Sequence, residues 1–159
     1  MTTSALEALD ELVREIEDPE LPHVTIGDLG IVRSVVIEGT TATVVLTPTY
    51  TGCPATEQIR DDVAEAVARA GYAPVVTMAM SPAWTTDWIS PRGRARLLAA
   101  GIAPPRPAGS QATMIDPPVG CPRCGSRRTR RVSAFGGTAC KASYTCTACG
   151  EPFELFKAL

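Results

Sequence analysis

Cys-Pro-Arg-Cys-Gly at residues 121–125 and Cys-Thr-Ala-Cys-Gly at residues 146–150 are two copies of one short motif in this chain of 159 residues. Each motif places two thiolates on one tight turn, and the glycine that follows gives the turn the backbone freedom it needs. Two such turns together supply the ligands of one tetrahedral metal ion. The predicted ligands are Cys121, Cys124, Cys146 and Cys149.

The segment between the two motifs predicts a β-hairpin. Residues 127–133 and 139–144 fit two strands that a turn at Gly136-Gly137 would join, which is the layout of a zinc ribbon. A unit of this size buries too little apolar surface to fold alone, and structural zinc contributes about 10–16 kcal/mol to such domains. We interpret the metal as a structural zinc ion whose four thiolates close the coordination shell. Iron or an iron–sulfur cluster is the alternative.

A fifth cysteine of this region, Cys140, falls on the second predicted strand and shares a face with Ala142 and Tyr144. A buried thiol is the simpler interpretation, because free cysteine packs like a small hydrophobic residue. The alternative is a further sulfur ligand that exchanges metal, and that role would require exposure to solvent.

The residues before the ribbon predict a linker and a separate α+β domain. Residues 103–118 contain five prolines and no hydrophobic period, so we expect a semi-rigid linker there. Upstream, apolar residues at helical spacing alternate with runs of β-branched residues, in the order α-β-β-α-β-α. The expected elements are helices at residues 6–16, 54–70 and 91–101 and strands at residues 31–37, 43–47 and 74–80. We therefore expect a domain with a short mixed sheet over residues 1–102 and the ribbon over residues 119–159.

Cys53 is the one cysteine before residue 120. If Pro54 takes the first helical position, Cys53 is the N-cap and its sulfur faces the unpaired amides of the helix start. Such a thiol can bind metal or act as a nucleophile, whereas a lone cysteine is otherwise inert. Asp28 is the nearest candidate for a hard ligand beside it, and is otherwise an ordinary turn residue. A Cys–His nucleophilic pair would have to use His23, the single histidine of the chain.

Two tryptophans, Trp84 and Trp88, lie four residues apart after the third predicted strand. We expect them to cover the sheet. A docking surface is the alternative, because aromatic side chains contribute much of the binding energy of many interfaces.

The net charge of −2 divides unevenly along the chain. Residues 1–120 contain 8 Lys and Arg against 15 Asp and Glu (−7), whereas residues 121–159 contain 7 against 2 (+5). Four thiolates and one divalent ion would lower the second figure by about two charges, so a basic face remains. The four arginines between residues 127 and 131 make nucleic-acid binding the rival function, although the acidic first domain argues against it.

Nothing in the sequence predicts export or a membrane span. The N-terminus has no basic stretch followed by an apolar run, and no segment approaches the ~18 apolar residues that a membrane-spanning helix requires. We therefore expect a cytoplasmic protein whose paired cysteines bind metal and form no disulfides.

Four motifs of the first domain resemble, in order and spacing, those of the metal–sulfur cluster assembly family. They are Asp18-Pro19-Glu20, Asp28-Leu29-Gly30-Ile31-Val32, Leu46-Thr47-Pro48-Thr49 and Thr51-Gly52-Cys53-Pro54. The resemblance covers about residues 5–102 and implies a small α/β domain that acts in the maturation of iron–sulfur proteins. It also implies that Cys53 and Asp28 are the functional residues, for transient binding of iron or an iron–sulfur cluster. Residues 21–24 depart from the family pattern, so His23 is either an additional nitrogen ligand or, in the favoured interpretation, incidental.

The ribbon resembles one branch of that family in particular. Residues 133–142 and 149–154 are similar to the family of D components of phenylacetyl-CoA epoxidase systems. This resemblance implies an accessory role in aerobic phenylacetate catabolism, with the di-iron oxygenase and the iron–sulfur flavoprotein reductase as partners and the maturation of one of their metal centres as the task. The chain has a single histidine, so it cannot supply the two Glu-x-x-His motifs of a di-iron site, and it has no Gly-x-Gly-x-x-Gly fingerprint. Both observations agree with an accessory protein that has no catalysis of its own. A structural role within the oxygenase complex is the alternative, and a homodimer is left open.

Overall fold

The computed structural model describes residues 2–107 and 118–157, and the chain divides into two compact units, residues 1–93 and 94–159. The division falls inside helix α3 (Pro91–Ala99), earlier than the predicted domain end at residue 102. Arg94, the first residue of the second unit, donates a 2.7 Å hydrogen bond from its guanidinium to the Pro105 carbonyl oxygen of the same unit. Most of the predicted linker, residues 108–117, lies outside the described residues.

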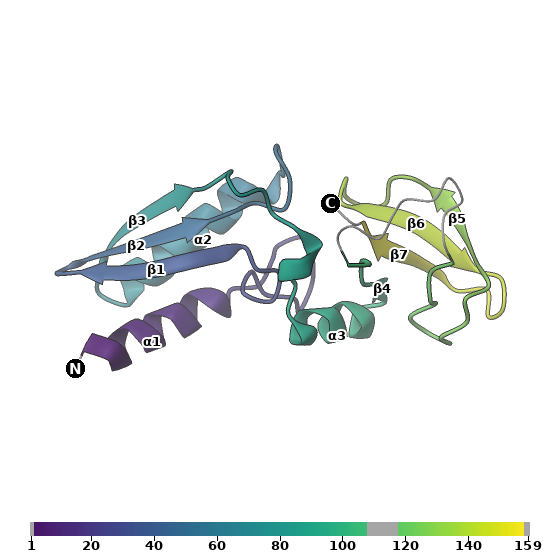
Figure 1. Cartoon of the computed structure of the whole chain (residues 1–159), viewed down its shortest axis with the longest axis horizontal. Helices are drawn as coiled ribbons and strands as arrows, with labels where there is room; N and C mark the ends of the chain where they lie inside the picture. Colours follow the sequence, from purple (N-terminus) through teal and green to yellow (C-terminus); the bar gives the residue numbers. More distant parts are fainter. Residues whose placement is uncertain (1, 108–117, 158–159) are drawn as a thin grey trace. The chain divides into compact units, whose positions relative to one another are not determined.

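The first unit and α3 contain the predicted order of elements, α-β-β-α-β-α (Figure 1). These elements are α1 (Thr2–Arg14), β1 (Val32–Glu38), β2 (Thr41–Leu46), α2 (Ala55–Arg69), β3 (Ala73–Met78) and α3, with a short 3-10 helix, η1 (Thr86–Trp88), before α3. The longest helix is α2, with 15 residues. Within the described part of the chain, no helix combines the length and the apolarity that a membrane span needs.

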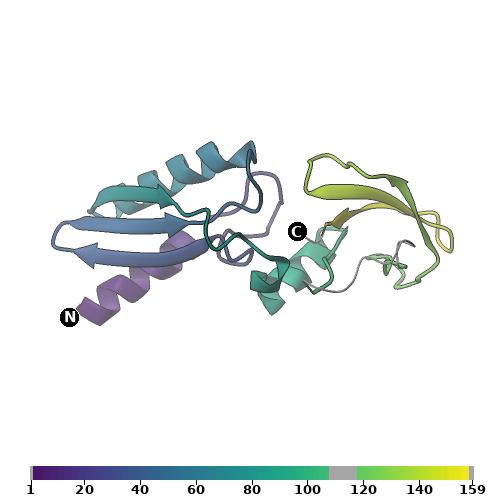
Figure 2. The same ribbon diagram turned by 45° about the horizontal axis from the view of Figure 1, so that its top comes forward.

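One face of the three-stranded sheet carries the core of the first unit. β1 and β2 form an antiparallel hairpin, and α2 is the crossover that leads to β3, which lies parallel to β2. Alternate residues of β2 are buried, and Figure 2 shows α1 and α2 together behind the strands on that side. The buried residues of these helices and of β2 include Leu9, Val13, Ile59, Val63, Val67, Ala42, Val44 and Leu46.

The second unit is a four-stranded sheet in the order β4-β7-β6-β5. Its strands are β4 (Ile102–Ala103), β5 (Thr129–Ser133), β6 (Lys141–Cys146) and β7 (Pro152–Phe156). The antiparallel pairing of β5 with β6 is the predicted hairpin, whereas β7 and β4 were not predicted. β4 has two residues and β7 starts at a proline, so neither has the run of β-branched residues that marks a strand in sequence.

Two details of the ribbon correct the sequence-based assignment. Ala103, the first residue of the predicted linker, belongs to β4 and pairs with Leu155 of β7. Cys140 lies in the turn immediately before β6, so it is not on the strand. The Tyr144 ring stacks on Phe153 with the ring centroids 5.7 Å apart, and two of the four motif cysteines, Cys121 and Cys146, belong to the same buried cluster.

Candidate functional site

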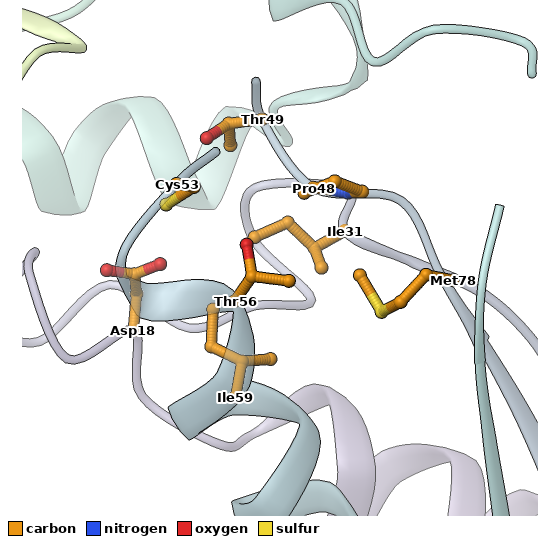
Figure 3. A pocket seen from close by; sticks show the side chains of 8 residues that line it. All are labelled: Asp18, Ile31, Pro48, Thr49, Cys53, Thr56, Ile59 and Met78. Atoms are coloured by element: carbon orange, nitrogen blue, oxygen red, sulfur yellow. The ribbon is translucent and has the colours of Figure 1, made fainter. Parts of the chain in front are cut away.

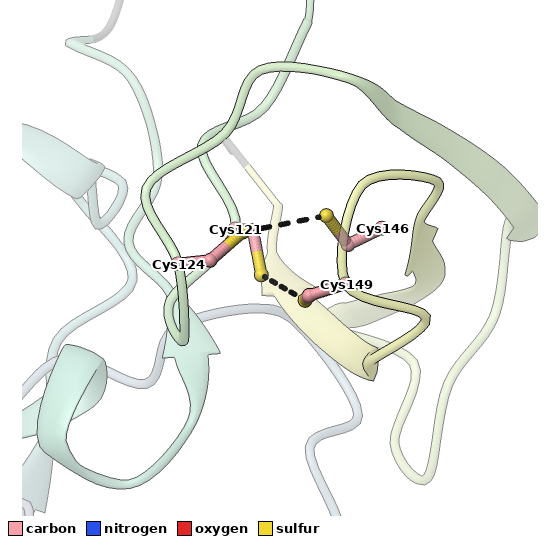
Figure 4. A group of neighbouring side chains, drawn as sticks. All are labelled: Cys121, Cys124, Cys146 and Cys149. Atoms are coloured by element: carbon pink, nitrogen blue, oxygen red, sulfur yellow. Dashed lines mark hydrogen bonds between the residues drawn. The ribbon is translucent and has the colours of Figure 1, made fainter.

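The four motif cysteines meet at one point of the second unit (Figure 4). Their sulfur atoms all lie within 4.8 Å of one another. The Cys121 and Cys149 sulfurs are 3.8 Å apart, and the Cys124 and Cys146 sulfurs are 3.6 Å apart. A tetrahedral zinc ion with Zn–S bonds of about 2.3 Å requires sulfurs about 3.8 Å apart. Two of the sulfur pairs match this separation, and the group as a whole is compact enough for one four-coordinate metal ion.

The turns that carry these cysteines explain the glycines of the two motifs. Gly125 and Gly150 have φ angles of 72° and 78°, in the left-handed region that favours glycine. Their amides donate hydrogen bonds to the carbonyl oxygens of Cys121 and Cys146, at 2.8 and 2.9 Å. The backbone amide of Cys149, followed by that of Ala148, lowers the pKa of the Cys146 thiol to about 7. The thiolate, which is the form that binds metal, is thus favoured at Cys146. At Cys149 the Glu151 amide lowers the pKa, but burial and the neighbouring Cys124 sulfur outweigh it and raise the pKa to about 12.

The fifth cysteine of the ribbon does not join this group. Cys140 is buried, with 4% of its surface exposed, and its sulfur lies 3.0 Å from the Thr138 hydroxyl oxygen. The burial agrees with a plain core thiol and lacks the exposure that a metal-exchanging sulfur would require.

Cys53 lies one residue further from the start of its helix than the sequence predicts. Helix α2 begins at Ala55, and Pro54 itself is the N-cap, with φ −65° and ψ −24°. The expectation that Cys53 is the N-cap is therefore wrong. Gly52 turns the chain with φ 84°, and the Cys53 carbonyl oxygen accepts a 3.1 Å hydrogen bond from the Thr56 amide. These contacts hold the half-buried Cys53 at the entrance of α2.

A small cavity of about 10 Å³ lies beside the Cys53 side chain (Figure 3). Its volume is close to that of one water-sized probe. One thiol, one carboxylate and two threonine hydroxyls are the polar side-chain groups on its wall, and the rest is apolar. The lining residues are Asp18, Ile31, Pro48, Thr49, Cys53, Thr56, Ile59 and Met78.

Asp18 is the acidic residue that the structure places with Cys53, and sequence reasoning missed it. Its side chain is buried, and one carboxylate oxygen accepts a 2.8 Å hydrogen bond from the Glu20 amide. Its own amide donates to the Val24 carbonyl oxygen at 2.8 Å, so both contacts fix it in the loop after α1. The signal was present in the sequence, because Asp18 begins the Asp18-Pro19-Glu20 motif, but on its own that motif indicates only the resemblance to the family.

Asp28 lies at a different place in the first unit and does not line the Cys53 cavity. Its Oδ1 accepts hydrogen bonds from the Arg92 Nε at 2.7 Å and from the Ser90 hydroxyl at 3.2 Å, and its Oδ2 accepts one from the Thr25 amide. Burial raises the pKa of Asp28, but the bonds from Arg92 and Thr25 together outweigh it and hold the pKa below its ordinary value. Asp28 thus joins the loop before β1 to the start of α3.

His23 is also outside the cavity wall. Its side chain is 83% exposed, and its Nδ1 lies 3.8 Å from a Glu17 carboxylate oxygen. Its φ of 65° is unusual for a residue other than glycine. The structure therefore brings Cys53 together with Asp18, and neither with His23.

The two tryptophans have different environments. Trp84 is buried and its indole N–H donates a 2.7 Å hydrogen bond to the Leu29 carbonyl oxygen. Trp88 is partly exposed, and the Arg33 guanidinium lies 3.6 Å from its ring centroid. Its backbone lies so close to Gly30 that a Cβ on that glycine would meet the Trp88 carbonyl oxygen at 2.6 Å. Both tryptophans thus support the loop that leads into β1.

Comparison with known families divides the chain into the same two parts. Residues 6–78 match the family described as iron-sulfur cluster assembly protein, and residues 105–157 match the PaaD zinc beta ribbon domain. The first match contains both Cys53 and Asp18, and the second contains all four motif cysteines.

Two relatives extend this result. The chain is 48% identical over 149 residues to the putative D component of the 1,2-phenylacetyl-CoA epoxidase of Escherichia coli (strain K12), with 93% of this chain and 90% of that protein covered. It is also similar to the crystal structure of a Domain of Unknown Function, DUF59, from Bacillus anthracis, with a TM-score of 0.55 and 26% identity over 60% of this chain and 92% of that one. The expected α+β fold is confirmed by this neighbour.

Proposed function

This chain belongs to the family of 1,2-phenylacetyl-CoA epoxidase D components, and from that membership we propose that it is an accessory component of a phenylacetyl-CoA epoxidase system. The match of its first unit to iron–sulfur cluster assembly proteins supports a role in maturation. The clients would be the iron–sulfur reductase or the di-iron oxygenase, which would receive iron or an iron–sulfur unit. The protein would act in phenylacetate catabolism without catalysing the epoxidation.

The observation that carries this proposal is the shared cavity of Cys53 and Asp18. A thiolate and a carboxylate are both competent iron ligands. Within residues 2–107 and 118–157, the ribbon cysteines form the sole group of three or more candidate ligand side chains that lie together, so Cys53 has no such group around it. A site with one thiolate and one carboxylate leaves most coordination positions to sulfide, water or a ligand of the client. Such an incomplete shell suits an ion or cluster that is passed on.

The four-cysteine site has the opposite character, and we propose that it holds structural zinc. Four thiolates fill a tetrahedral shell and leave no position for a client ligand. Iron in place of zinc is the alternative that metal analysis distinguishes.

Asp28 remains a proposed functional residue, but its proposed role is to hold the loop before β1 and not to bind metal. Its carboxylate bonds hold the loop before β1, and Ile31, three residues later, lines the Cys53 cavity. In this proposal Asp28 supports the shape of the cavity, and Asp18 is the carboxylate next to the cargo.

The proposal is tested by anaerobic reconstitution of the apo-reductase and the apo-oxygenase with the iron-loaded full-length chain. Cys53→Ser is expected to lower the rate of metal-centre formation about tenfold or more, because the thiolate ligand is lost. Cys140→Ser is the matched control, since it removes a thiol that lies outside both sites. Equal rates of centre formation with wild type and Cys53→Ser would eliminate the maturation role. A constant stoichiometry with the active oxygenase, together with those equal rates, would favour the alternative of a structural role within the oxygenase complex.

A further inference from the structure

The basic charge of the ribbon is concentrated on one strand because its acidic side chains are already paired. Glu151 forms an ion pair with Arg123, and the Lys141 ammonium lies 2.7 Å from a Glu154 carboxylate oxygen. Arg127, Arg128 and Arg130, by contrast, form no ion pair with a carboxylate anywhere in the described chain. The uncompensated positive charge therefore lies at the start of β5 and along it.

β5 is an edge strand and its side chains are open to solvent. The sheet order β4-β7-β6-β5 leaves one side of β5 without a partner strand among the described residues. Val132 is 60% exposed and Phe135, two residues after the strand, is 67% exposed, the highest values among the large hydrophobic residues of the described chain. The Lys157 ammonium lies 4.7 Å from the Phe135 ring centroid, which adds a further cation. Val132 and Phe135 thus offer apolar surface close to cations, and aromatic residues and arginine are both enriched at interfaces.

A shallow groove of about 480 Å³ runs from β5 across the sheet. Arg130 pairs with Thr145 and Thr145 with Pro152, so these residues form one row over β5, β6 and β7. Val132 also lines the groove, and the one acidic residue on its wall, Glu154, is held by Lys141. The groove thus has a neutral floor, a cationic side and an apolar side.

We propose that the β5 surface, made of Arg128, Arg130, Val132 and Phe135 with this groove, is the docking site for an acidic segment of a partner protein. The proposal rests on the proposed function in one respect, because the partner is then an epoxidase component that receives metal. The acidic side chains would pair with Arg128 and Arg130, and an aliphatic or aromatic side chain next to them in the segment would cover Val132 and Phe135. The docking residues belong to the second unit and Cys53 to the first, so the docking site uses none of the residues proposed to bind the cargo.

A protein partner fits this chain better than a nucleic acid. Residues 1–93 contain 5 Lys and Arg against 14 Asp and Glu, a net charge of −9, whereas residues 94–159 contain 10 against 3, a net charge of +7. A nucleic acid carries negative charge along its whole length and would be repelled by the tethered first unit. A short acidic segment places its charge on the β5 surface alone.

The test measures binding of the zinc-loaded full-length chain to the purified reductase and oxygenase components at low and high salt. Arg130→Glu is expected to weaken binding about tenfold at low ionic strength, because an arginine at an interface centre contributes about this much. Arg60→Glu is the matched control, since it makes the same charge change at an exposed position of α2 in the first unit. Arg130→Gln provides a milder variant, and unchanged zinc content and circular dichroism establish that each variant is folded.

Wild-type affinity in Arg130→Glu for every component would overturn the docking site. Binding of a short single-stranded DNA that Arg130→Glu abolishes, with component binding unchanged, would also overturn it in favour of the nucleic-acid alternative. The two proposals fail separately. Arg130→Glu should regain full metal delivery at high protein concentration, whereas Cys53→Ser should not, and normal delivery by Cys53→Ser would end the maturation role while leaving the docking result intact.

Discussion

The four-cysteine site of the ribbon and the Cys53 site of the first unit both offer sulfur ligands, but in different numbers. In the ribbon, four sulfurs within 4.8 Å of one another complete a metal shell among themselves. In the first unit, Cys53 stands with one carboxylate at a cavity of about 10 Å³. In the function proposed above, the complete thiolate shell retains its ion, whereas the site with one thiolate and one carboxylate passes its ion on. The comparison thus shows how ligand number would separate a structural metal from a transferable one.

The largest expected effect comes from removing one ligand of the four-cysteine site. Cys146→Ser should abolish zinc retention and unfold the ribbon strands, because structural zinc contributes about 10–16 kcal/mol to domains of this kind. Heteronuclear NMR spectra of the full chain would show collapse of the signals of residues 118–157 with those of the first unit preserved. Cys53→Ser is the control and should keep one zinc per chain. A folded ribbon in zinc-free Cys146→Ser would contradict the structural role.

The next effect concerns Gly30, in the loop that leads to Ile31 on the wall of the Cys53 cavity. Gly30→Ala should destabilise the first unit by about 2–3 kcal/mol, because the new methyl group would meet the Trp88 backbone at 2.6 Å and the residue has φ 71°. Gly39→Ala separates the two causes, since Gly39 has φ 62° and no atom within 4 Å of an added Cβ. Urea denaturation followed by tryptophan fluorescence reports on this unit alone, because both tryptophans lie in it. Equal losses in the two variants would show that the Trp88 contact contributes nothing.

A smaller effect distinguishes the two aspartates. Asp28→Asn should lower stability by about 1–3 kcal/mol at neutral pH, because it weakens the bonds from Arg92 and Thr25 to a buried group. The pKa of Asp28 is lowered in the fold, so its contribution is present above the unfolded pKa and is lost as the pH falls through the folded value. The stability difference between wild type and Asp28→Asn should therefore shrink as the pH falls below about 5, and should go on shrinking below the unfolded pKa of about 3.9.

Asp18→Asn is the counterpart of that variant and should act on cargo. It removes the carboxylate charge from the cavity of Cys53, so iron affinity should fall while the loop keeps its hydrogen bond from the Glu20 amide. Anaerobic iron titration of both variants provides the measurement. Greater loss of iron affinity in Asp28→Asn than in Asp18→Asn would restore Asp28 as the residue beside the thiol.

The sequence predicted the features that depend on local pattern. The order of helices and strands in the first unit follows from hydrophobic period, and the meeting of the four ribbon cysteines follows from their spacing. It missed β7, because a five-residue strand that begins with Pro152 is defined by its partner β6 and not by its own composition.

The composition of the Cys53 site could not be predicted for a related reason. Asp18 and Asp28 lie in the same long loop region before β1, and their distances in sequence from Cys53 do not say which carboxylate reaches it. The choice depends on Arg92 of α3, which binds Asp28, and on the loop contact with Glu20 that fixes Asp18, which lines the cavity with Cys53. Contacts between elements far apart in the chain decide which aspartate lies beside Cys53, and such contacts cannot be predicted from one sequence.

The division between a retained and a transferable metal is tested most directly by a chelator titration of the anaerobically loaded full-length chain. Zinc and iron per chain are measured as the chelator concentration rises, in wild type, Cys53→Ser and Cys140→Ser. We predict two phases in wild type and Cys140→Ser, with iron released first and one zinc released last, and loss of the iron phase alone in Cys53→Ser. An iron phase that persists in Cys53→Ser, or zinc that leaves together with the iron, would contradict this account.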